Sequence, residues 1–183
     1  SDVTVTRGAL DTSAFYEIRK QGNVSFGYIE LSTFGTDTAK QVETALEMFK
    51  KKNIQTLVID LRDNGGGYLT AATDILDLFF TSDEVIYQMK EKNSAAKKYY
   101  AESDKKYEFE NGYILVNENT ASASELTAGA LQSEKGYQLI GKTTYGKGSA
   151  QTQKTLSDGS VLKYTYAKWM IPNGTCINGK GLT

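Results

Sequence analysis

The feature that most constrains the fold is an apolar, β-branched run without alternation over Thr56–Leu61, followed closely by the glycine triplet Gly65–Gly67. A strand with one solvated face alternates apolar and polar residues, whereas a strand covered on both faces is continuously apolar. We therefore expect Thr56–Leu61 to be a central strand with both faces covered. The triplet breaks the chain, and apolar residues at helical spacing then predict an amphipathic helix: Leu69, Ala72, Ile75, Leu76 and Phe79.

The same rhythm of strand and helix runs along much of the chain. Val24–Leu31 is predicted to be a strand and Thr38–Lys51 a helix, with N-cap chemistry offered by Thr36 and Asp37. The remaining predicted elements are strands at Val85–Lys90, Tyr113–Val116 and Tyr137–Ile140 and a helix at Ala121–Gln132. Repeated β-α-β order predicts an α/β fold.

Three segments fall outside this rhythm. Thr152–Trp169 alternates and contains the turn sequence Ser157-Asp158-Gly159, so it is predicted to be an antiparallel hairpin appended to the core. Lys92–Glu110 is polar and rich in tyrosine and lysine, and we expect an exposed hairpin or excursion there. Asp2–Arg7 alternates like a strand that has no preceding partner, as in a piece cut from a longer protein.

Amino-acid composition limits the classes of binding and catalytic site that the chain can form. A chain of 183 residues with 39% hydrophobic content fits one domain over 1–183. The net charge of -1 lacks the basic excess of nucleic-acid-binding proteins, and no apolar run approaches the roughly 20 residues that cross a bilayer. The chain has no histidine and one cysteine, Cys176, which excludes histidine-based triads, an internal disulfide and Cys/His metal sites. A nucleophile here needs another base, and lysine is the usual substitute.

Three patterns imitate known motifs. Gly141–Gly148 nearly spells a phosphate-binding P-loop, but Gly148 stands where the motif needs Ser or Thr, so we interpret the segment as a sharp turn. The glycine triplet resembles a dinucleotide loop with Thr70 in place of its third glycine, and both a tight turn and an anion cradle stay open. Ser94–Lys97 copies the Ser-x-x-Lys signature of penicillin-binding enzymes among exposed lysines, so we interpret it as solvated surface.

The segment Asn119–Glu125 differs from these patterns because small hydroxyl residues follow an apolar strand and open a helix. Ser122 lies at the helix N-terminus, where free N–H groups and the helix dipole stabilise negative charge. Glu125 lies three residues later on the same helical face. Taken alone, the segment favours helix capping by serine over catalysis.

Three blocks together resemble, in order and spacing, the signature blocks of the C-terminal processing (tail-specific) peptidases. The blocks are Asp60–Gly67, Val116–Glu125 and Tyr145–Gln151. Ile29–Phe34 and Ile177–Gly181 are also similar to segments of that family, so the resemblance spans nearly the whole chain. The chain departs from the family pattern at Gly65, where members usually carry proline.

The resemblance implies a ClpP/crotonase-like layered β-α-β core and a serine peptidase without metal or organic cofactor. The implied residues are Ser122 as nucleophile, Lys147 as general base, Glu125 and Gln151 as residues that position the lysine, and an oxyanion hole of the Ala123 N–H and that of Gly66 or Gly67. Glycine on both sides of Lys147 allows the chain to bend tightly enough to aim this side chain inward.

The resemblance also implies a class of substrate and a cellular location. Extracytoplasmic proteins would be cut near apolar C-terminal tails, through an acyl-enzyme, on the periplasmic or secreted side of the cell envelope. Members usually carry a PDZ domain that binds the substrate's C-terminus, and residues 1–7 would be its last strand or a linker. The full-length protein would carry a membrane anchor, and the resemblance is compatible with a homo-oligomer. A noncatalytic ligand- or peptide-binding module on the same fold is the alternative.

Overall fold

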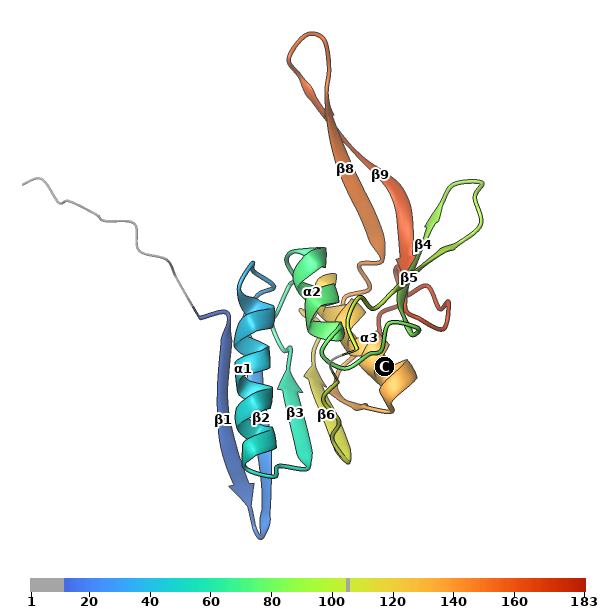
Figure 1. Cartoon of the computed structure of the whole chain (residues 1–183). Helices are drawn as coiled ribbons and strands as arrows, with labels where there is room; N and C mark the ends of the chain where they lie inside the picture. Colours follow the sequence, from blue (N-terminus) through green and yellow to red (C-terminus); the bar gives the residue numbers. More distant parts are fainter. Residues whose placement is uncertain (1–11, 105) are drawn as a thin grey trace, which may run out of the picture.

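A computed structural model describes residues 12–104 and 106–183, which form two β-sheets and three helices (Figure 1). The first sheet has the strand order β1-β2-β3-β6-β7. Its strands are β1 (Ala14–Gln21), β2 (Val24–Leu31), β3 (Thr56–Asp60), β6 (Asn111–Val116) and β7 (Gln138–Gly141). β1 is antiparallel to β2, and all other neighbours are parallel. The predicted α/β class is confirmed, whereas the predicted strand Asp2–Arg7 lies outside the described residues.

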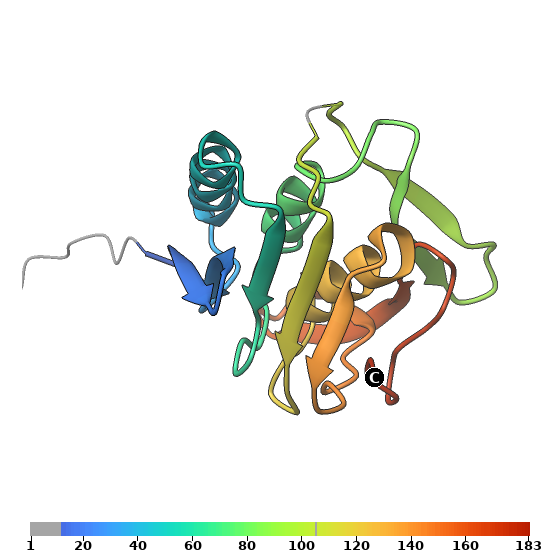
Figure 2. The same cartoon turned by 90° about the horizontal axis from the view of Figure 1, so that it is seen from below.

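Three helices cover one face of this sheet (Figure 2). They are α1 (Thr38–Lys51), α2 (Leu69–Leu76) and α3 (Ala123–Lys135). The core lies between them and the sheet, where Phe49 of α1 and Leu57 and Ile59 of β3 are among its most buried side chains. Among the described residues, no helix is long and apolar enough to cross a membrane.

β3 is central, as predicted, but the described residues cover one of its faces fully and the other only in part. Leu57 and Ile59 are buried on the helix side, whereas Val58, which points to the opposite face, is half-buried. Val58 lines a hollow of about 510 Å³ on that face together with Phe26 and Leu115. The expectation of two covered faces is wrong for the described part of the chain, because apolar character does not reveal whether another layer covers it.

The antiparallel appendage is a four-stranded sheet of order β5-β4-β9-β8. Its strands are β4 (Val85–Glu91), β5 (Lys97–Tyr100), β8 (Ser149–Thr155) and β9 (Val161–Met170). The hairpin of β8 and β9 was predicted, and it projects away from the body (Figure 1). The predicted excursion Lys92–Glu110 begins as a hairpin with β4, but its later part contributes Tyr107 to the core.

The cap of one helix and the start of another differ from the prediction. α1 begins at Thr38 as expected, but Asp37 makes no side-chain cap; the Thr38 hydroxyl instead accepts a hydrogen bond from the Gly35 N–H at 2.8 Å. α3 begins at Ala123 and not at Ala121, because the backbone turns sharply at Ser122. β1 was not predicted at all, and its residues lack a clean alternation of buried and exposed positions.

An ion pair between buried Asp60 and half-exposed Arg62 fixes the carboxyl end of β3, immediately before the glycine loop. The Asp60 side chain is only 4% exposed and accepts hydrogen bonds from the Arg62 guanidinium at 2.9 and 2.6 Å and from the Tyr28 hydroxyl at 2.7 Å. Burial raises the pKa of the Asp60 carboxyl, but the hydrogen bonds from Arg62 and Tyr28 outweigh burial and hold this pKa below its ordinary value. The contact therefore stabilises the ionised form of Asp60.

Replacing this guanidinium in an Arg62→Met variant is expected to lower the free energy of unfolding at pH 7 by about 1–3 kcal/mol, because a buried carboxylate loses its charged partner. The folded-state pKa of Asp60 lies below its unfolded value, so the stabilisation is present above the unfolded pKa and is lost as the pH falls through the folded pKa. The difference from wild type should thus shrink below about pH 4. Urea unfolding at neutral and acidic pH measures both quantities.

Lys142→Met is the control, because the exposed pair of Lys142 with Glu118 should contribute less than about 1 kcal/mol. An Arg62→Met loss of equal size at both pH values would contradict the role given to Asp60.

Candidate active site

Ser122 lies at a sharp turn between β6 and α3. Its backbone has φ 59° and ψ −118°, a conformation that a residue with a side chain adopts only at an energetic cost. The Ser122 N–H donates to Glu125 Oε2 at 2.9 Å, and its carbonyl accepts from the Leu126 N–H at 3.0 Å. The start of α3 therefore holds the strained turn in place.

Two serines stand in this segment, and their surroundings differ. Ser124 is fully buried, and its hydroxyl donates to the Asn64 carbonyl at 2.9 Å. Ser122 is partly exposed and lines a pocket. Only the Ser122 hydroxyl is therefore placed to meet a ligand.

The fully buried Glu125 connects the serine turn to a second loop. Its Oε1 accepts from the Thr144 hydroxyl and the Gly146 N–H, both at 2.6 Å. Its Oε2 accepts from the N–H groups of Ser122 at 2.9 Å and Lys147 at 2.8 Å. A single carboxylate oxygen thus accepts from both N–H groups. The backbone nitrogens of Ser122 and Lys147 are therefore separated by no more than the sum of these two hydrogen-bond distances.

The structure thus brings the backbone of Lys147 beside Ser122, but not its amine. The sequence predicted an inward side chain, whereas the Lys147 side chain is exposed, and within residues 12–104 and 106–183 no hydrogen bond joins it to Ser122. Gln151 is also exposed, and its amide donates to the Thr165 hydroxyl at 3.5 Å instead of to Lys147. The roles of Lys147 and Gln151 stay predictions.

The glycines beside Lys147 serve close packing. Gly146 has a φ of +83°, and a Cβ on it would lie 2.8 Å from the Gly181 backbone nitrogen. A Cβ on Gly148 would lie 2.9 Å from the Asn178 backbone nitrogen. The C-terminal segment therefore packs directly against the lysine turn and fixes its backbone.

Asn64 holds the glycine loop against the serine turn. Its Nδ2 donates to the Leu31 carbonyl at 2.6 Å, and its Oδ1 accepts from the Gly66 N–H at 2.9 Å. Its backbone carbonyl accepts from the Ala121 N–H at 3.0 Å. The Gly66 N–H is therefore already bonded, whereas the Gly67 N–H has no acceptor in the part of the chain that the structure describes.

A pocket of about 210 Å³ opens beside Ser122. Its border includes Gly67 and Ala123, and Ala123 is the first residue of α3, whose N–H finds no acceptor within the helix. Apolar side chains from four elements form much of the wall: Leu69, Met89, Leu126, Tyr166 and Trp169. An apolar cavity with a hydroxyl and two backbone donors at its edge has the chemistry of a ligand site.

Comparison with known proteins identifies the family of the chain. The model of Peptidase family S41 matches residues 25–183. The chain belongs to this family. It is 40% identical over 173 residues to the carboxy-terminal processing protease CtpB of Bacillus subtilis, covering 94% of this chain and 36% of that protein. CtpA of the same organism is 35% identical over 181 residues, with 99% and 38% covered.

A solved structure gives the same result for this S41 chain. The photosystem II D1 C-terminal processing protease superposes with a TM-score of 0.84 at 28% identity, covering 94% of this chain and 47% of that one. The resemblance to C-terminal processing peptidases and the layered fold it implied are thereby confirmed. The chain spans less than half the length of each of these three relatives.

Sequence reasoning missed three polar residues of the candidate site: Asn64, Ser124 and Thr144. All three are buried and hydrogen-bonded to the loops that meet at Ser122. Asn64 and Ser124 lie inside the family-like blocks, and Thr144 directly precedes one. Their position in or beside these blocks could have marked them as site residues. Their hydrogen-bond partners, however, come from distant segments and could not be inferred from sequence spacing.

Two motif-like patterns are settled by their structural context. The glycine-rich segment 141–148 connects strand β7 to strand β8, whereas a P-loop must open a helix, so the structure excludes the P-loop interpretation. Ser94 lies exposed between β4 and β5, which confirms a surface segment.

Glu125→Gln is expected to lower the free energy of unfolding of the S41 core by about 2–4 kcal/mol. One carboxyl oxygen becomes an NH2 group that faces two hydrogen-bond donors, so buried donors lose their acceptor. Denaturant unfolding measures the loss. Glu134→Gln, the same change at an exposed position of α3, should cost less than about 0.5 kcal/mol. Equal losses would show that the four contacts of Glu125 are not what joins the loops.

Proposed function

We propose that this chain is the catalytic core of a serine endopeptidase that cuts protein substrates through an acyl-enzyme, with Ser122 as nucleophile and Lys147 as general base. The observation that carries the proposal is the strained Ser122 turn, which places one hydroxyl at an apolar pocket. The pocket is bordered by Ala123 and Gly67, whose N–H groups have no acceptor among the described residues. Membership of family S41 supports peptide hydrolysis.

In the proposed reaction, Ser122 Oγ attacks the substrate carbonyl carbon while Lys147 Nζ takes the hydroxyl proton. The N–H groups of Ala123 and Gly67 stabilise the resulting oxyanion; we choose Gly67 because Asn64 already uses the Gly66 N–H. The C–N bond breaks as the Lys147 ammonium gives its proton to the leaving amine. Water then attacks the acyl ester as Lys147 takes one of its protons; the ester C–O bond breaks, Lys147 returns that proton to Ser122 Oγ, and the new carboxylic acid is released.

This reaction requires the amine of Lys147 to turn inward. Glu125 already holds the Lys147 backbone beside Ser122, and rotation of an exposed side chain takes only picoseconds to nanoseconds. Gln151, in the pocket wall, would meet the turned-in amine and position it.

The substrate class follows from the pocket wall and from the relatives. Apolar side chains in the wall favour an apolar residue next to the scissile bond, and two relatives are named carboxy-terminal processing proteases. We therefore propose substrates with apolar C-terminal tails. A PDZ domain elsewhere in the longer protein, an extracytoplasmic location with a membrane anchor, and assembly into a homo-oligomer complete the proposal and rest on the resemblance alone.

A noncatalytic peptide-binding module is the second candidate, and the exposed Lys147 amine is the observation in its favour. It predicts that an apolar-tailed peptide binds at the pocket but is not cut. The peptidase proposal predicts cleavage that depends on both members of the dyad.

Ser122→Ala and Lys147→Ala, each in the full-length protein, are expected to lower the rate of cleavage of an unfolded, apolar-tailed substrate by about 1000-fold or more, because each removes a group required in the transition state. Product formation followed by mass spectrometry measures the rate. Lys142→Ala, at an exposed lysine of the same loop, is the matched control and should cut like wild type.

If both dyad variants cut as fast as wild type, the assignment of Ser122 and Lys147 is wrong. If the wild type binds the substrate without cutting it, the binding module is the better description.

A further inference from the structure

The β8–β9 hairpin begins inside the candidate site and leaves the body of the protein. The first residues of β8, Ser149 to Gln151, line the pocket beside Ser122, and so does Tyr166 of β9. From there the two strands run outward as a pair with little else beside them (Figure 1). Any chain that leaves the pocket in this direction would pass along the hairpin.

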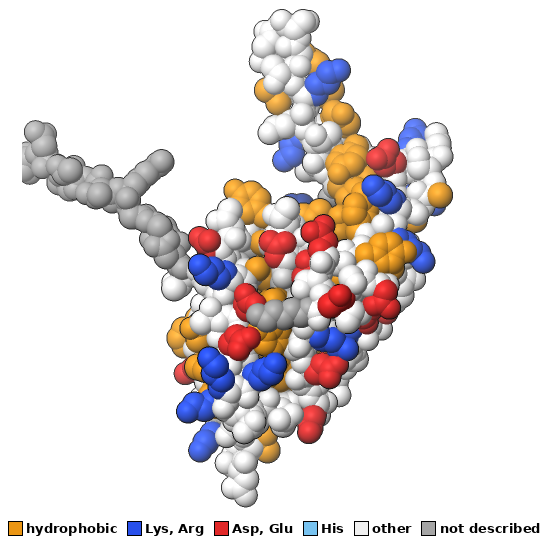
Figure 3. All heavy atoms as spheres, in the orientation of Figure 1, with side chains coloured by type: hydrophobic (Ala, Val, Ile, Leu, Met, Phe, Trp, Pro, Cys, Tyr) orange, Lys and Arg blue, Asp and Glu red, His pale blue; other side chains and the backbone are white. Residues whose placement is uncertain are grey.

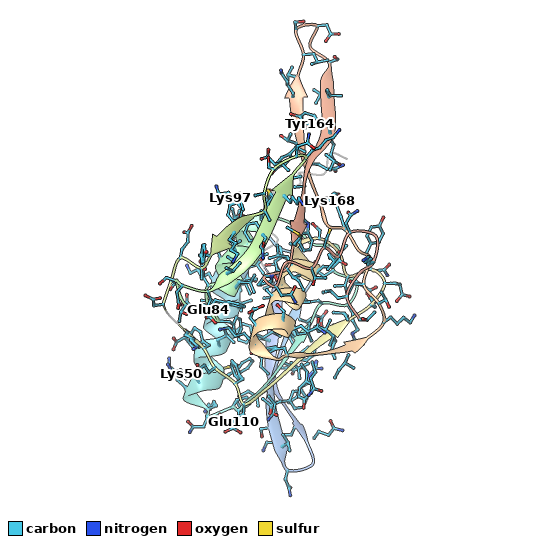
Figure 4. All side chains as sticks on the ribbon, turned by 90° about the vertical axis from the view of Figure 1, so that its right-hand side faces the viewer. Lys50, Glu84, Lys97, Glu110, Tyr164 and Lys168 are labelled. Carbon is cyan, nitrogen blue, oxygen red and sulfur yellow. The ribbon has the colours of Figure 1, made fainter. Side chains whose placement is uncertain are left out.

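The outer part of the hairpin carries large apolar side chains that are exposed. Leu162, Tyr164 and Tyr166 occupy three successive alternate positions of β9 and are 49%, 43% and 38% exposed. The Tyr166 hydroxyl also reaches the sulfur of Met89, another pocket residue, at 3.6 Å. Figure 3 shows hydrophobic side chains gathered over the base of the hairpin, where it meets β4 and β5, and Figure 4 places Tyr164 farther out along the hairpin than Lys168.

The hairpin also offers unpaired backbone groups. β8 is an edge strand that pairs only with β9, and its residues from Gln151 to Thr155 are exposed. A free edge of this kind is where an extended peptide adds to a sheet through main-chain hydrogen bonds. Exposed edges are commonly shielded by proteins, so a long edge next to a site indicates a binding surface.

We propose that the hairpin is an extended substrate-binding surface, in which Leu162 and Tyr164 hold an extended apolar segment of the polypeptide whose scissile bond lies at Ser122. This inference rests on the proposed function and names which part of the substrate is recognised beyond the pocket. The charged residues of the hairpin are Lys154, Lys163, Lys168 and Asp158, and this positive excess disfavours a basic segment, while exposed Leu162 and Tyr164 favour an apolar one.

The test compares two substrates with the same residues around the scissile bond. The short one fills only the pocket, and the long one adds six apolar residues on the side that would run along the hairpin. In the full-length protein, a Leu162→Ser/Tyr164→Ser double variant is expected to lower kcat/KM for the long substrate by about tenfold, because contacts to two large apolar side chains are lost. The kcat/KM for the short substrate should not change.

Tyr100→Ser/Val24→Ser is the matched control, because these side chains are 48% and 55% exposed but lie on β5 and β2, outside the pocket lining. This control variant should leave kcat/KM unchanged for both substrates. A long substrate with lysines in the added segment should gain nothing over the short one. The inference is overturned if the double variant has the wild-type kcat/KM for the long substrate, or if its kcat/KM falls equally for both substrates.

A second measurement does not depend on catalysis. A photo-crosslinking side chain placed at position 164 of the Ser122→Ala protein should attach to the long peptide and not to the short one. Attachment to another part of the protein, or to a second copy of it, would show that a different partner covers the hairpin and would overturn the inference. Failure of the dyad test with successful crosslinking would overturn only the proposed function.

Discussion

The buried carboxyl of Glu125 is the interaction on which the site depends. It accepts hydrogen bonds from two loops that are separated in sequence, and one of its oxygens binds the backbone of both Ser122 and Lys147. Without an acceptor at this point, several buried N–H groups would be unpaired, at a cost comparable to a large part of a domain's net stability. The hydrogen bonds that set the geometry of the site therefore also stabilise the fold.

A second polar residue, Asn64, does the same for the glycine loop. Its side chain and carbonyl bind β2, the loop itself and the serine turn, and its Oδ1 takes the Gly66 N–H, whereas the Gly67 N–H has no partner in the described chain. The strained backbone at Ser122 is held between Asn64 and Glu125. A backbone fixed by these hydrogen bonds and an exposed Lys147 side chain are compatible with the proposed reaction, in which the amine has to turn inward.

Most of the elements could be predicted from the sequence, because hydrophobic period and turn residues are local signals. The bounds of β2 and α1 agree with the prediction, and the appended hairpin was recognised from its alternation and its Ser157-Asp158-Gly159 turn. β1 escaped prediction because its residues are mostly half-buried and carry little period. The open face of β3 could not be predicted, since an apolar side chain looks the same whether or not a layer covers it.

By itself, the sequence determined the chemistry that is excluded and the residue types that remain: with no histidine, a serine nucleophile must rely on another base. It also determined the family, through three blocks in register. Only the tertiary structure decided that Ser122 and not Ser124 faces the pocket, that Glu125 binds the backbone of Lys147 and not its amine, and that Gly67 keeps a free donor. The physical reason is that hydrogen-bond partners distant in sequence are selected by how loops pack, which no local pattern records.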